Sequence, residues 1–477
     1  MKRAWRLTAV LLATVWPVAG VSAQSSSGSA SPSQAASASQ NSYSGSVPGK
    51  LEAGTIQISL HEAIHRGLKQ NLGALLANED IGAARGERWK QLSALLPNAN
   101  LTTFVDDSQV SLAEYGFKFN FPGVTIPSIV GPFGYYDSRM QVTQSVFDWK
   151  AINNTHAASQ SLKATEYTYK DARDLVILAV GYAYLQAIAD DARVDTAEAQ
   201  VKTAQTLYDQ ASDQLKAGTS PAIDALRAQV ELKTRQQQLI QAKNDLAIQK
   251  LTVARVIGLA PAQEFQLTDK SLYAPLEAIT VEDALKHAYA SRSDYQAALA
   301  NVHAAEYART AAHAGYYPSI SFNGDYGIAA DLPTTLVHGV FDARATLTIP
   351  IFEGGRVKGD VLAADAQLHQ AQEKAQNLQA QIDADVRTAL LNLQSSQDQV
   401  NVAQSNIDLA EQTLAQSRDR FAAGVTNTVE VVQAEEQVAS AHEQYISSLY
   451  QFNYSKISLA RALGLAEEGV NQYFKGR

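Results

Sequence analysis

The sequence contains one long segment twice, and this duplication constrains the fold more than any other feature. The matching stretches are residues 58–64 (ISLHEAI) with 279–285 (ITVEDAL), Leu96-Pro97 with Tyr317-Pro318, 215–218 (LKAG) with 421–424 (FAAG), and 255–259 (RVIGL) with 461–465 (RALGL). Each copy is about 200 residues long, well beyond the repeat length of solenoid proteins. We therefore predict a body with internal pseudo-symmetry rather than a single catalytic pocket.

The N-terminal segment predicts an exported protein. Lys2 and Arg3 precede an apolar stretch at residues 7–21, and residues 21–23 (VSA) provide a small-residue cleavage site, so residues 1–23 are expected to be a signal peptide. Residues 24–50 are almost entirely Ser, Gly, Ala, Gln and Pro, which predicts a disordered leader. No later segment is expected to reach the roughly twenty apolar residues of a spanning helix.

The composition excludes several classes of function. The chain has no cysteine, so it can form neither a disulfide nor an acylated N-terminal cysteine. Its formal net charge is −9, its pI is about 5.5, and we find no basic stripe, so no nucleic-acid partner is expected. No cofactor is predicted.

Two very long helices are predicted, one in each copy. Residues 149–216 and 356–423 contain no proline and one glycine each, and a helix of about 68 residues is roughly 100 Å long. Apolar residues recur every seven positions, followed three positions later by small residues, which predicts a left-handed coiled coil. The apolar positions are Val180, Ala187, Val194, Val201, Tyr208 and Leu215 in the first copy, and Val386, Leu393, Val400, Ile407, Leu414 and Phe421 in the second.

Glycines end both long helices and predict helical hairpins. Gly218 and Gly424 suit the left-handed cap conformation, and second helices are expected to run back over residues 221–257 and 427–463. Further helices are expected at 71–96 and 294–317. Residues 261–278 are predicted to form an equatorial connection at mid-height, which the tail at 466–477 would join.

Short segments before each long helix alternate with a period of two. Strand pairs are expected within residues 98–148 and 318–352, with Pro97, Pro318, Gly354 and Gly355 at the junctions of strand and helix. Strands of roughly ten residues with one apolar and one polar face are typical of outer-membrane barrels. Four strands cannot close a barrel, and lipid tolerates only closed sheets, so several copies would have to share one. The alternative is a soluble two-sheet domain at the end of a coiled coil.

These motifs together resemble the TolC-like outer-membrane efflux proteins. The resemblance is carried by residues 59–64 (SLHEAI), 95–97 (LLP), 350–355 (PIFEGG), 421–424 (FAAG) and 460–464 (ARALG), and extends over residues 51–465. It implies an α+β membrane protein whose homotrimer forms a twelve-stranded outer-membrane β-barrel, continued by a periplasmic α-helical barrel. The repeats would span residues 51–260 and 279–465. The expected partners are outer-membrane lipid, a periplasmic adaptor and an inner-membrane pump. Without a cysteine, this chain would belong with the non-acylated members.

The resemblance also assigns roles to the hairpin tips, which would form the periplasmic mouth and the adaptor-docking sites. The docking positions would be Gly218, Thr219, Gly424 and Val425. The gate carboxylate would be Glu430, with Asp224 in the first tip and Gln433 where a second acid is expected. The tyrosine and arginine that lock the family's tips fall on Phe421 and Thr426, facing Asp224 and Ile223, so the polar lock cannot form in the same way. Alternatively, Glu430 and Asp224 are first-turn carboxylates that favour the helix dipole.

Two other functions compete with the duct. Residues 61–65 (HEAIH) match the zinc motif HExxH, which alone would support a hydrolase. The second copy has Glu282 and Lys286 in place of His61 and His65, so we interpret the match as fortuitous and predict no enzyme and no metal. The remaining alternative is a periplasmic coiled-coil adaptor or scaffold without a pore. An adaptor would carry one hairpin, whereas this sequence predicts two hairpins, each preceded by a strand pair.

Overall fold

The computed structural model describes residues 43–112, 114, 116, 123, 127–269, 279–332, 337–426 and 428–467. The predicted signal peptide, most of the leader, residues 270–278 of the equatorial connection and residues 468–477 of the tail lie outside these ranges. In the first copy the elements are β1 (Ile56–Ile58), α2 (Leu60–Gln70), α3 (Leu72–Ser93), β2 (Asn98–Ser111), β3 (Ile129–Phe147), α4 (Trp149–Lys216) and α5 (Ala222–Ile257). The strand β4 (Phe265–Leu267) lies in the equatorial connection between the copies. The second copy contains α6 (Val281–Ser291), α7 (Ser293–His313), the 3-10 turn η1 (Ala314–Tyr316), β5 (Ser319–Leu332), β6 (Val337–Thr348), α8 (Arg356–Ala422) and α9 (Thr428–Ala462).

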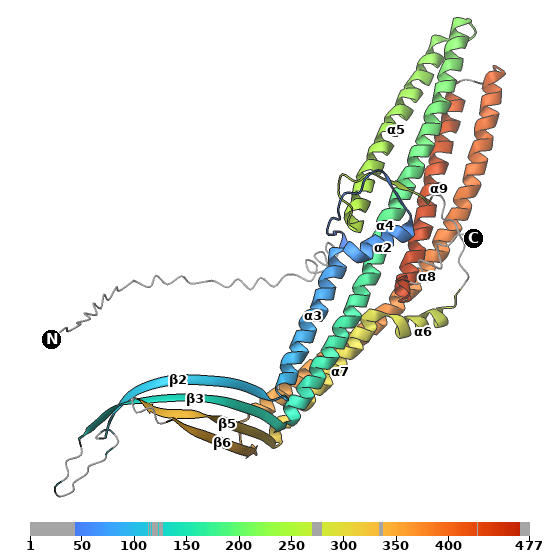
Figure 1. Ribbon diagram of the computed structural model, residues 1–477. Coiled ribbons are helices and arrows are strands. Elements are labelled where there is room, and N and C mark those ends of the chain that lie inside the picture. The colour runs from blue at the N-terminus through green and yellow to red at the C-terminus, as the bar shows by residue number, and fades with distance from the viewer. Residues whose placement is uncertain are drawn as a thin grey trace, which may run out of the picture. The chain divides into compact units, whose positions relative to one another are not determined.

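The duplication in the sequence is a duplication of structure. The order α2–α3–β2–β3–α4–α5 returns as α6–α7–β5–β6–α8–α9. Toward the hairpin tips the helices lie side by side in the order α5, α4, α9 and α8; toward the sheet, α3 and α7 take the places of α5 and α9 (Figure 1). The two long helices therefore run through both levels, and shorter helices complete a layer of four.

The seven-residue pattern marks the buried seam of α4 and α8. Val180 and Ala187 in α4 and Val386 in α8 are fully buried, and Phe421 is 6% exposed. Leu215 departs from the pattern: it is 38% exposed, although it occupies the position in α4 that Phe421 occupies in α8. Gly218 and Gly424 both have φ +71°, which a side chain would disfavour, so the predicted left-handed helix ends are confirmed.

The four long strands form one antiparallel sheet in the order β2-β3-β5-β6. Pairing of β3 with β5 joins the strand pair of the first copy to that of the second. The strands contain 14, 19, 14 and 12 residues, so they exceed the expected ten. Within the described residues, β2 and β6 are the edges of this sheet, each paired on one side.

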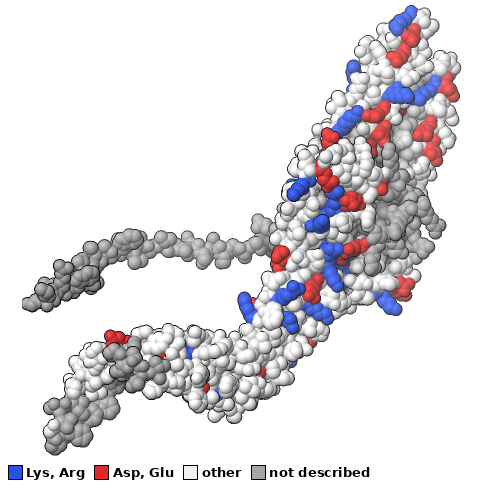
Figure 2. Space-filling view, in the orientation of Figure 1, with Lys and Arg blue, Asp and Glu red and all other residues white. Residues whose placement is uncertain are grey.

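The two faces of the sheet differ in chemistry. One row of paired residues across all four strands is Leu101, Met140, Tyr326 and Phe341, with exposures of 72%, 52%, 71% and 79%. The adjacent row, on the opposite face, is Asn100, Gln141, Asp325 and Asp342. Figure 2 shows that Lys, Arg, Asp and Glu are spread over the helices and sparse on the visible face of the sheet.

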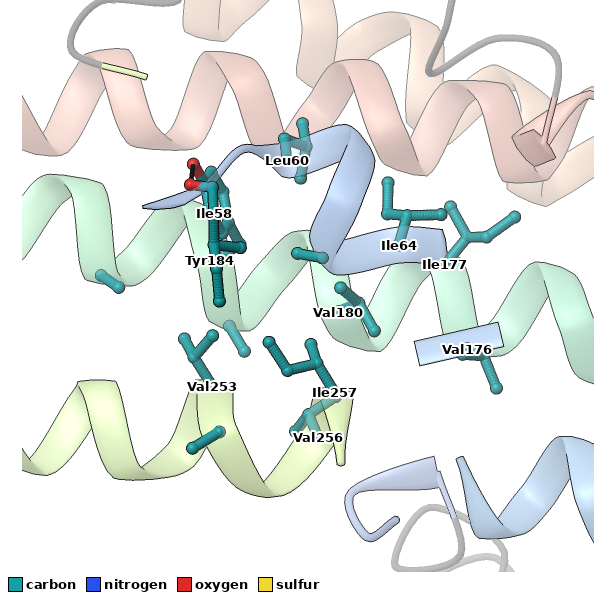
Figure 3. Packing of buried hydrophobic residues seen from close by; sticks show 14 of the residues in the cluster. Ile58, Leu60, Ile64, Val176, Ile177, Val180, Tyr184, Val253, Val256 and Ile257 are labelled. Atoms are coloured by element: carbon teal, nitrogen blue, oxygen red, sulfur yellow. Dashed lines mark hydrogen bonds between the residues drawn. The ribbon is translucent and has the colours of Figure 1, made fainter. Parts of the chain in front are cut away.

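Contrary to expectation, α4 contains an 18-residue window that is apolar enough to pass for a spanning helix, with a mean hydropathy of 1.4. However, 56% of that window is buried inside the protein. The fully buried side chains of Val176, Ile177 and Val180 belong to this part of α4 and pack in a core with Ile58 of β1 and Ile257 of α5 (Figure 3). The apolar stretch is therefore the core strip of a long helix.

The predicted leader ends earlier than expected. Val47 N–H donates to the carbonyl of Gln70 (2.9 Å), and Gly49 N–H donates to that of Gly258 (2.8 Å). Asn71 Nδ2 donates to the Tyr43 carbonyl (2.7 Å). The prediction of disorder to Lys50 is thus wrong from Tyr43 onward, because hydrogen bonds to its backbone hold this segment and Tyr43 packs against the buried core.

Candidate functional site

The predicted gate residue of the second tip is held within its own hairpin. Glu430 lies in the first turn of α9, and Nη1 of Arg420, in the last turn of α8, is 3.0 Å from its Oε1. The hydroxyl of Thr426 donates to its other oxygen, Oε2. Both carboxylate oxygens therefore have partners, while 34% of the side chain remains exposed.

The first tip repeats part of this arrangement. Asp224, in the first turn of α5, accepts a hydrogen bond from Ser220 Oγ (3.1 Å), as Glu430 does from Thr426. Its cationic partner is Arg227 on the same helix, at 3.6 Å. Both carboxylates thus act at helix N-termini, as the helix-dipole interpretation expects, and this local role is compatible with a position at a channel mouth.

An apolar cluster takes the place of the family's polar lock. Phe421 of α8 belongs to a buried cluster whose other members are Leu207 and Ala211 of α4, Ala225 and Ala228 of α5, and Val431 of α9. The cluster spans both hairpins, so Phe421 connects the tips through packing. Thr426 bonds within its own tip and is not paired with Asp224 or Ile223 in the described residues.

The other predicted tip residues lie at the surface. Ile223 is 49% exposed and Val425 is 69% exposed, and Gln433 is exposed as well. The hydroxyl of Thr219 donates to the Gln214 carbonyl (3.1 Å), which fastens the turn to the end of α4. These positions are accessible for docking, which remains a prediction.

Sequence reasoning missed a group of charges just beyond the tips. Arg235 Nε lies 2.5 Å from Glu231 Oε1, and both side chains are buried. Arg418 of α8 lies 3.2 Å from Glu435 of α9, and burial raises the pKa of the Glu435 carboxyl. The spacing of Glu231 and Arg235 by four residues on one helix was a signal that could have identified the first pair.

The junctions between strand and helix lie where they were predicted. Pro97 and Pro318 immediately precede β2 and β5. Gly354 and Gly355 have φ values of +61° and +87° and turn the chain into α8. At the same point of the first copy, Asp148 caps α4 by accepting from Ala151 N–H (3.0 Å).

A charged cluster fastens the two copies together within the sheet. Arg139 of β3 lies 2.7 Å from Asp137 on its own strand and 3.2 Å from Asp325 on β5. Gly327 of β5 is paired with Arg139, and a Cβ at this glycine would lie 2.1 Å from the Ser138 carbonyl oxygen. The close approach of β3 and β5 therefore depends on this glycine.

Buried charges also connect the copies near mid-height. Arg461 of α9 pairs with Asp171 of α4 and lies 3.9 Å from Asp294 of α7. Arg292 lies 2.6 Å from Asp294 and 3.1 Å from Asp385 of α8. Asp174, one turn from Asp171, is 8% exposed, and burial raises the pKa of its carboxyl to about 6.

The residues that match the zinc motif lie on α2. His61 and His65 are exposed, while Glu62 accepts from Arg66 Nε (2.7 Å). Among the described residues, no group of three or more His, Asp or Glu side chains is placed to share a metal ion. The absence of a resident metal and of catalysis remains a prediction.

An amphipathic sheet joined to long paired helical hairpins defines a channel of the outer-membrane type. The family model described as "Outer membrane efflux protein" matches residues 73–259 and 284–465, well over half of the chain. The chain therefore belongs to the outer membrane efflux protein family, a family of channel proteins rather than enzymes.

Individual relatives support the same assignment. The probable efflux pump outer membrane protein SepC of Pseudomonas putida is 24% identical over 426 residues, covering 85% of this chain and 83% of SepC. The cation efflux system protein CusC of Escherichia coli is 25% identical over 335 residues, covering 65% of this chain and 69% of CusC.

The fold is shared with solved channels. The crystal structure of the outer membrane protein VceC from Vibrio cholerae has a TM-score of 0.71 at 19% identity, covering 85% of this chain and 96% of VceC. A structure of CusC gives a TM-score of 0.73 at 20% identity, covering 87% of this chain and 95% of CusC.

Proposed function

We propose that three copies of this chain form a passive exit duct of a tripartite efflux or type I secretion system. Each chain contributes its four strands to a twelve-stranded barrel in the outer membrane, and its layer of four helices to a periplasmic tunnel. A periplasmic adaptor and an inner-membrane pump supply the cargo and the driving force.

The observation that carries this proposal is the exposed apolar row of the sheet. Leu101, Met140, Tyr326 and Phe341 present large side chains in one line across all four strands. Such a row is stable against lipid, but a sheet with two open edges is not, because unpaired backbone groups are costly there. Pairing with the sheets of two further chains gives the backbone groups of both edges their hydrogen-bond partners, and twelve strands leave room for a lumen.

The tips form the periplasmic mouth in this arrangement. Glu430, Asp224 and Gln433 face the entrance. Phe421 holds the two hairpins of one chain together. An adaptor docks at Gly218, Thr219, Gly424 and Val425. Residues 1–23 direct export, and attachment depends on the barrel, since the chain has no cysteine for acylation. Relatives differ in the way they are attached to the membrane: SilC of Salmonella typhimurium is named a probable outer membrane lipoprotein.

The cargo is set mainly by the pump. Relatives are named for efflux of toluene, efflux of cations and export of pyoverdine, three chemically different cargoes. A wall rich in Gln, Ser and Asn suits such variety. One groove between α8 and α9, for example, includes Gln394, Ser395, Gln399, Asn406 and Ser447.

Extraction and mass measurement test the proposal against the adaptor alternative. Membranes containing the protein are washed at alkaline pH, and the native mass of the protein is then measured in mild detergent. An integral duct stays in the membrane and has three times the mass of one chain plus bound detergent. Release into the wash as a soluble protein would favour the periplasmic scaffold.

A further inference from the structure

We infer that Arg420 determines the ion preference of the mouth by neutralising Glu430. This inference rests on the proposed function, which places the second tip at the periplasmic entrance. With Arg420 paired, the Glu430 carboxylate contributes little net charge to passing solutes. Without it, three carboxylates would face one another across the entrance and select for cations.

The geometry supports this role. Arg420 Nη1 lies 3.0 Å from Glu430 Oε1, and the hydroxyl of Thr426 donates a hydrogen bond to Glu430 Oε2. The two charged side chains come from different arms of the hairpin, since Arg420 lies in the last turn of α8 and Glu430 in the first turn of α9. Both remain partly exposed, at 57% and 34%, so the pair faces solvent where an ion would pass.

The two tips differ at the position of this arginine. Glu430 and Asp224 are related by 430 − 224 = 206 positions, as are Thr426 and Ser220. The same shift places Gln214 at the position of Arg420, so the first tip keeps the contact of hydroxyl with carboxylate but lacks this cation. In the first tip, Arg227 on the same helix pairs with Asp224 instead, at the longer distance of 3.6 Å.

The two carboxylates also differ in access to solvent. The Asp224 side chain is 11% exposed, whereas that of Glu430 is 34% exposed. Carboxylates brought together without a cationic partner in a narrow entrance attract cations, and divalent cations most strongly. Loss of Arg420 should therefore change ion selectivity more than loss of Arg227. A partly exposed pair is also screened by salt, so the difference should shrink at high ionic strength.

Reversal potentials in planar bilayers test the inference with variants of opposite sign. The purified full-length protein is compared with Arg420→Gln, Glu430→Gln, the double variant and Arg227→Gln, in a KCl gradient at low and high salt, with and without Ca²⁺. Native mass and melting temperature are measured for each variant. Arg420→Gln should raise the ratio of K⁺ to Cl⁻ permeability several-fold and add block by Ca²⁺. Glu430→Gln should lower the ratio, the double variant should return close to the unmodified protein, and Arg227→Gln should shift it less.

Three results would overturn the inference while leaving the duct intact. These are an unchanged reversal potential in a conducting, folded Arg420→Gln protein, a double variant that keeps the full effect of Arg420→Gln, and an equal effect of Arg227→Gln. Absence of any conductance in the unmodified protein would instead refute the proposed function, and the inference with it.

Discussion

The hydroxyl of Tyr184 lies 2.7 Å from Oδ2 of Asp269 and joins the middle of α4 to the chain that follows β4. Tyr184 is fully buried, and the Asp269 oxygen also accepts from Leu60 N–H at the start of α2 (2.8 Å). One carboxylate therefore organises the equatorial region of the first copy. The short parallel pairing of β1 with β4 lies beside it.

Replacement of Tyr184 by Phe should destabilise this region. The change keeps the ring but leaves a partly buried carboxylate with one partner fewer, at a cost of about 1–3 kcal/mol. Thermal unfolding of the detergent-solubilised protein should show a lower melting temperature. Tyr167→Phe is the control, because its ring contact with Lys170 (5.4 Å) survives the loss of the hydroxyl. Equal melting temperatures for both variants would contradict the role of the Tyr184 hydroxyl.

Asp174 should make stability depend on pH. Burial raises the pKa of its carboxyl from 3.8 to about 6, so between these values the folded state binds more protons than the unfolded state. The contribution of Asp174 to stability therefore falls as pH rises from about 4 through about 6. Asp174→Asn should remove this dependence and stabilise the protein above pH 6, by on the order of 2 kcal/mol.

Asp294→Asn is the matched control, and its effect should have the opposite sign, because burial of the Asp294 carboxyl is outweighed by its hydrogen bonds and ion pair with Arg292, which lower its pKa and would be lost. Melting temperatures from pH 4 to pH 7.5 measure both changes. A stabilising Asp294→Asn, or an Asp174→Asn profile parallel to that of the unmodified protein, would contradict the assignment.

Gly327 should be essential for joining the two strand pairs. In Gly327→Ala the new methyl group would overlap the Ser138 carbonyl at 2.1 Å and the Arg139 Cα at 2.7 Å, so β5 could no longer approach β3. We expect little protein assembled in the outer membrane. Gly339→Ala on β6 is the control, since its nearest neighbour would be the Tyr326 hydroxyl at 4.0 Å. Normal assembly of Gly327→Ala would show that the pairing of β3 with β5 is wrong.

Charge on the two faces of β6 should have different consequences. Phe341 belongs to the apolar row and Asp342, the next residue, to the opposite polar row. Lysine on a lipid-facing position costs about 2–4 kcal/mol near the middle of the bilayer. Phe341→Lys should therefore reduce the amount of protein in purified outer membranes, and Asp342→Lys should not. Equal recovery of both variants would argue that this face does not meet lipid.

Much of the fold could be predicted because its signals are repeated. The seven-residue spacing from Val386 to Phe421 identified the seam of α8, and the alternation around Met140 and Tyr326 identified both faces of the sheet. Failures occurred where tertiary contacts override local pattern. Residues from Tyr43 onward are ordered by backbone hydrogen bonds, and Leu215 is exposed although the matching Phe421 is buried in the apolar cluster between the hairpins.

The position of Glu430 near the second tip could be predicted from the sequence, but its ion pair with Arg420 could not. Position relative to Gly424 placed Glu430 near the tip. The pairing with Arg420 depends on how the last turn of α8 faces the first turn of α9, which residue spacing across a turn does not specify. The packing of Phe421 with both hairpins likewise requires knowing that α4, α5 and α9 meet at that height.

The most direct test of the central claim is the single-channel conductance of the detergent-purified protein in planar bilayers, with the oligomer mass measured in parallel. The duct predicts a trimer that inserts and gives small, discrete current steps. A protein that stays soluble without detergent and carries no current would contradict the barrel and leave a periplasmic coiled-coil scaffold as the better description.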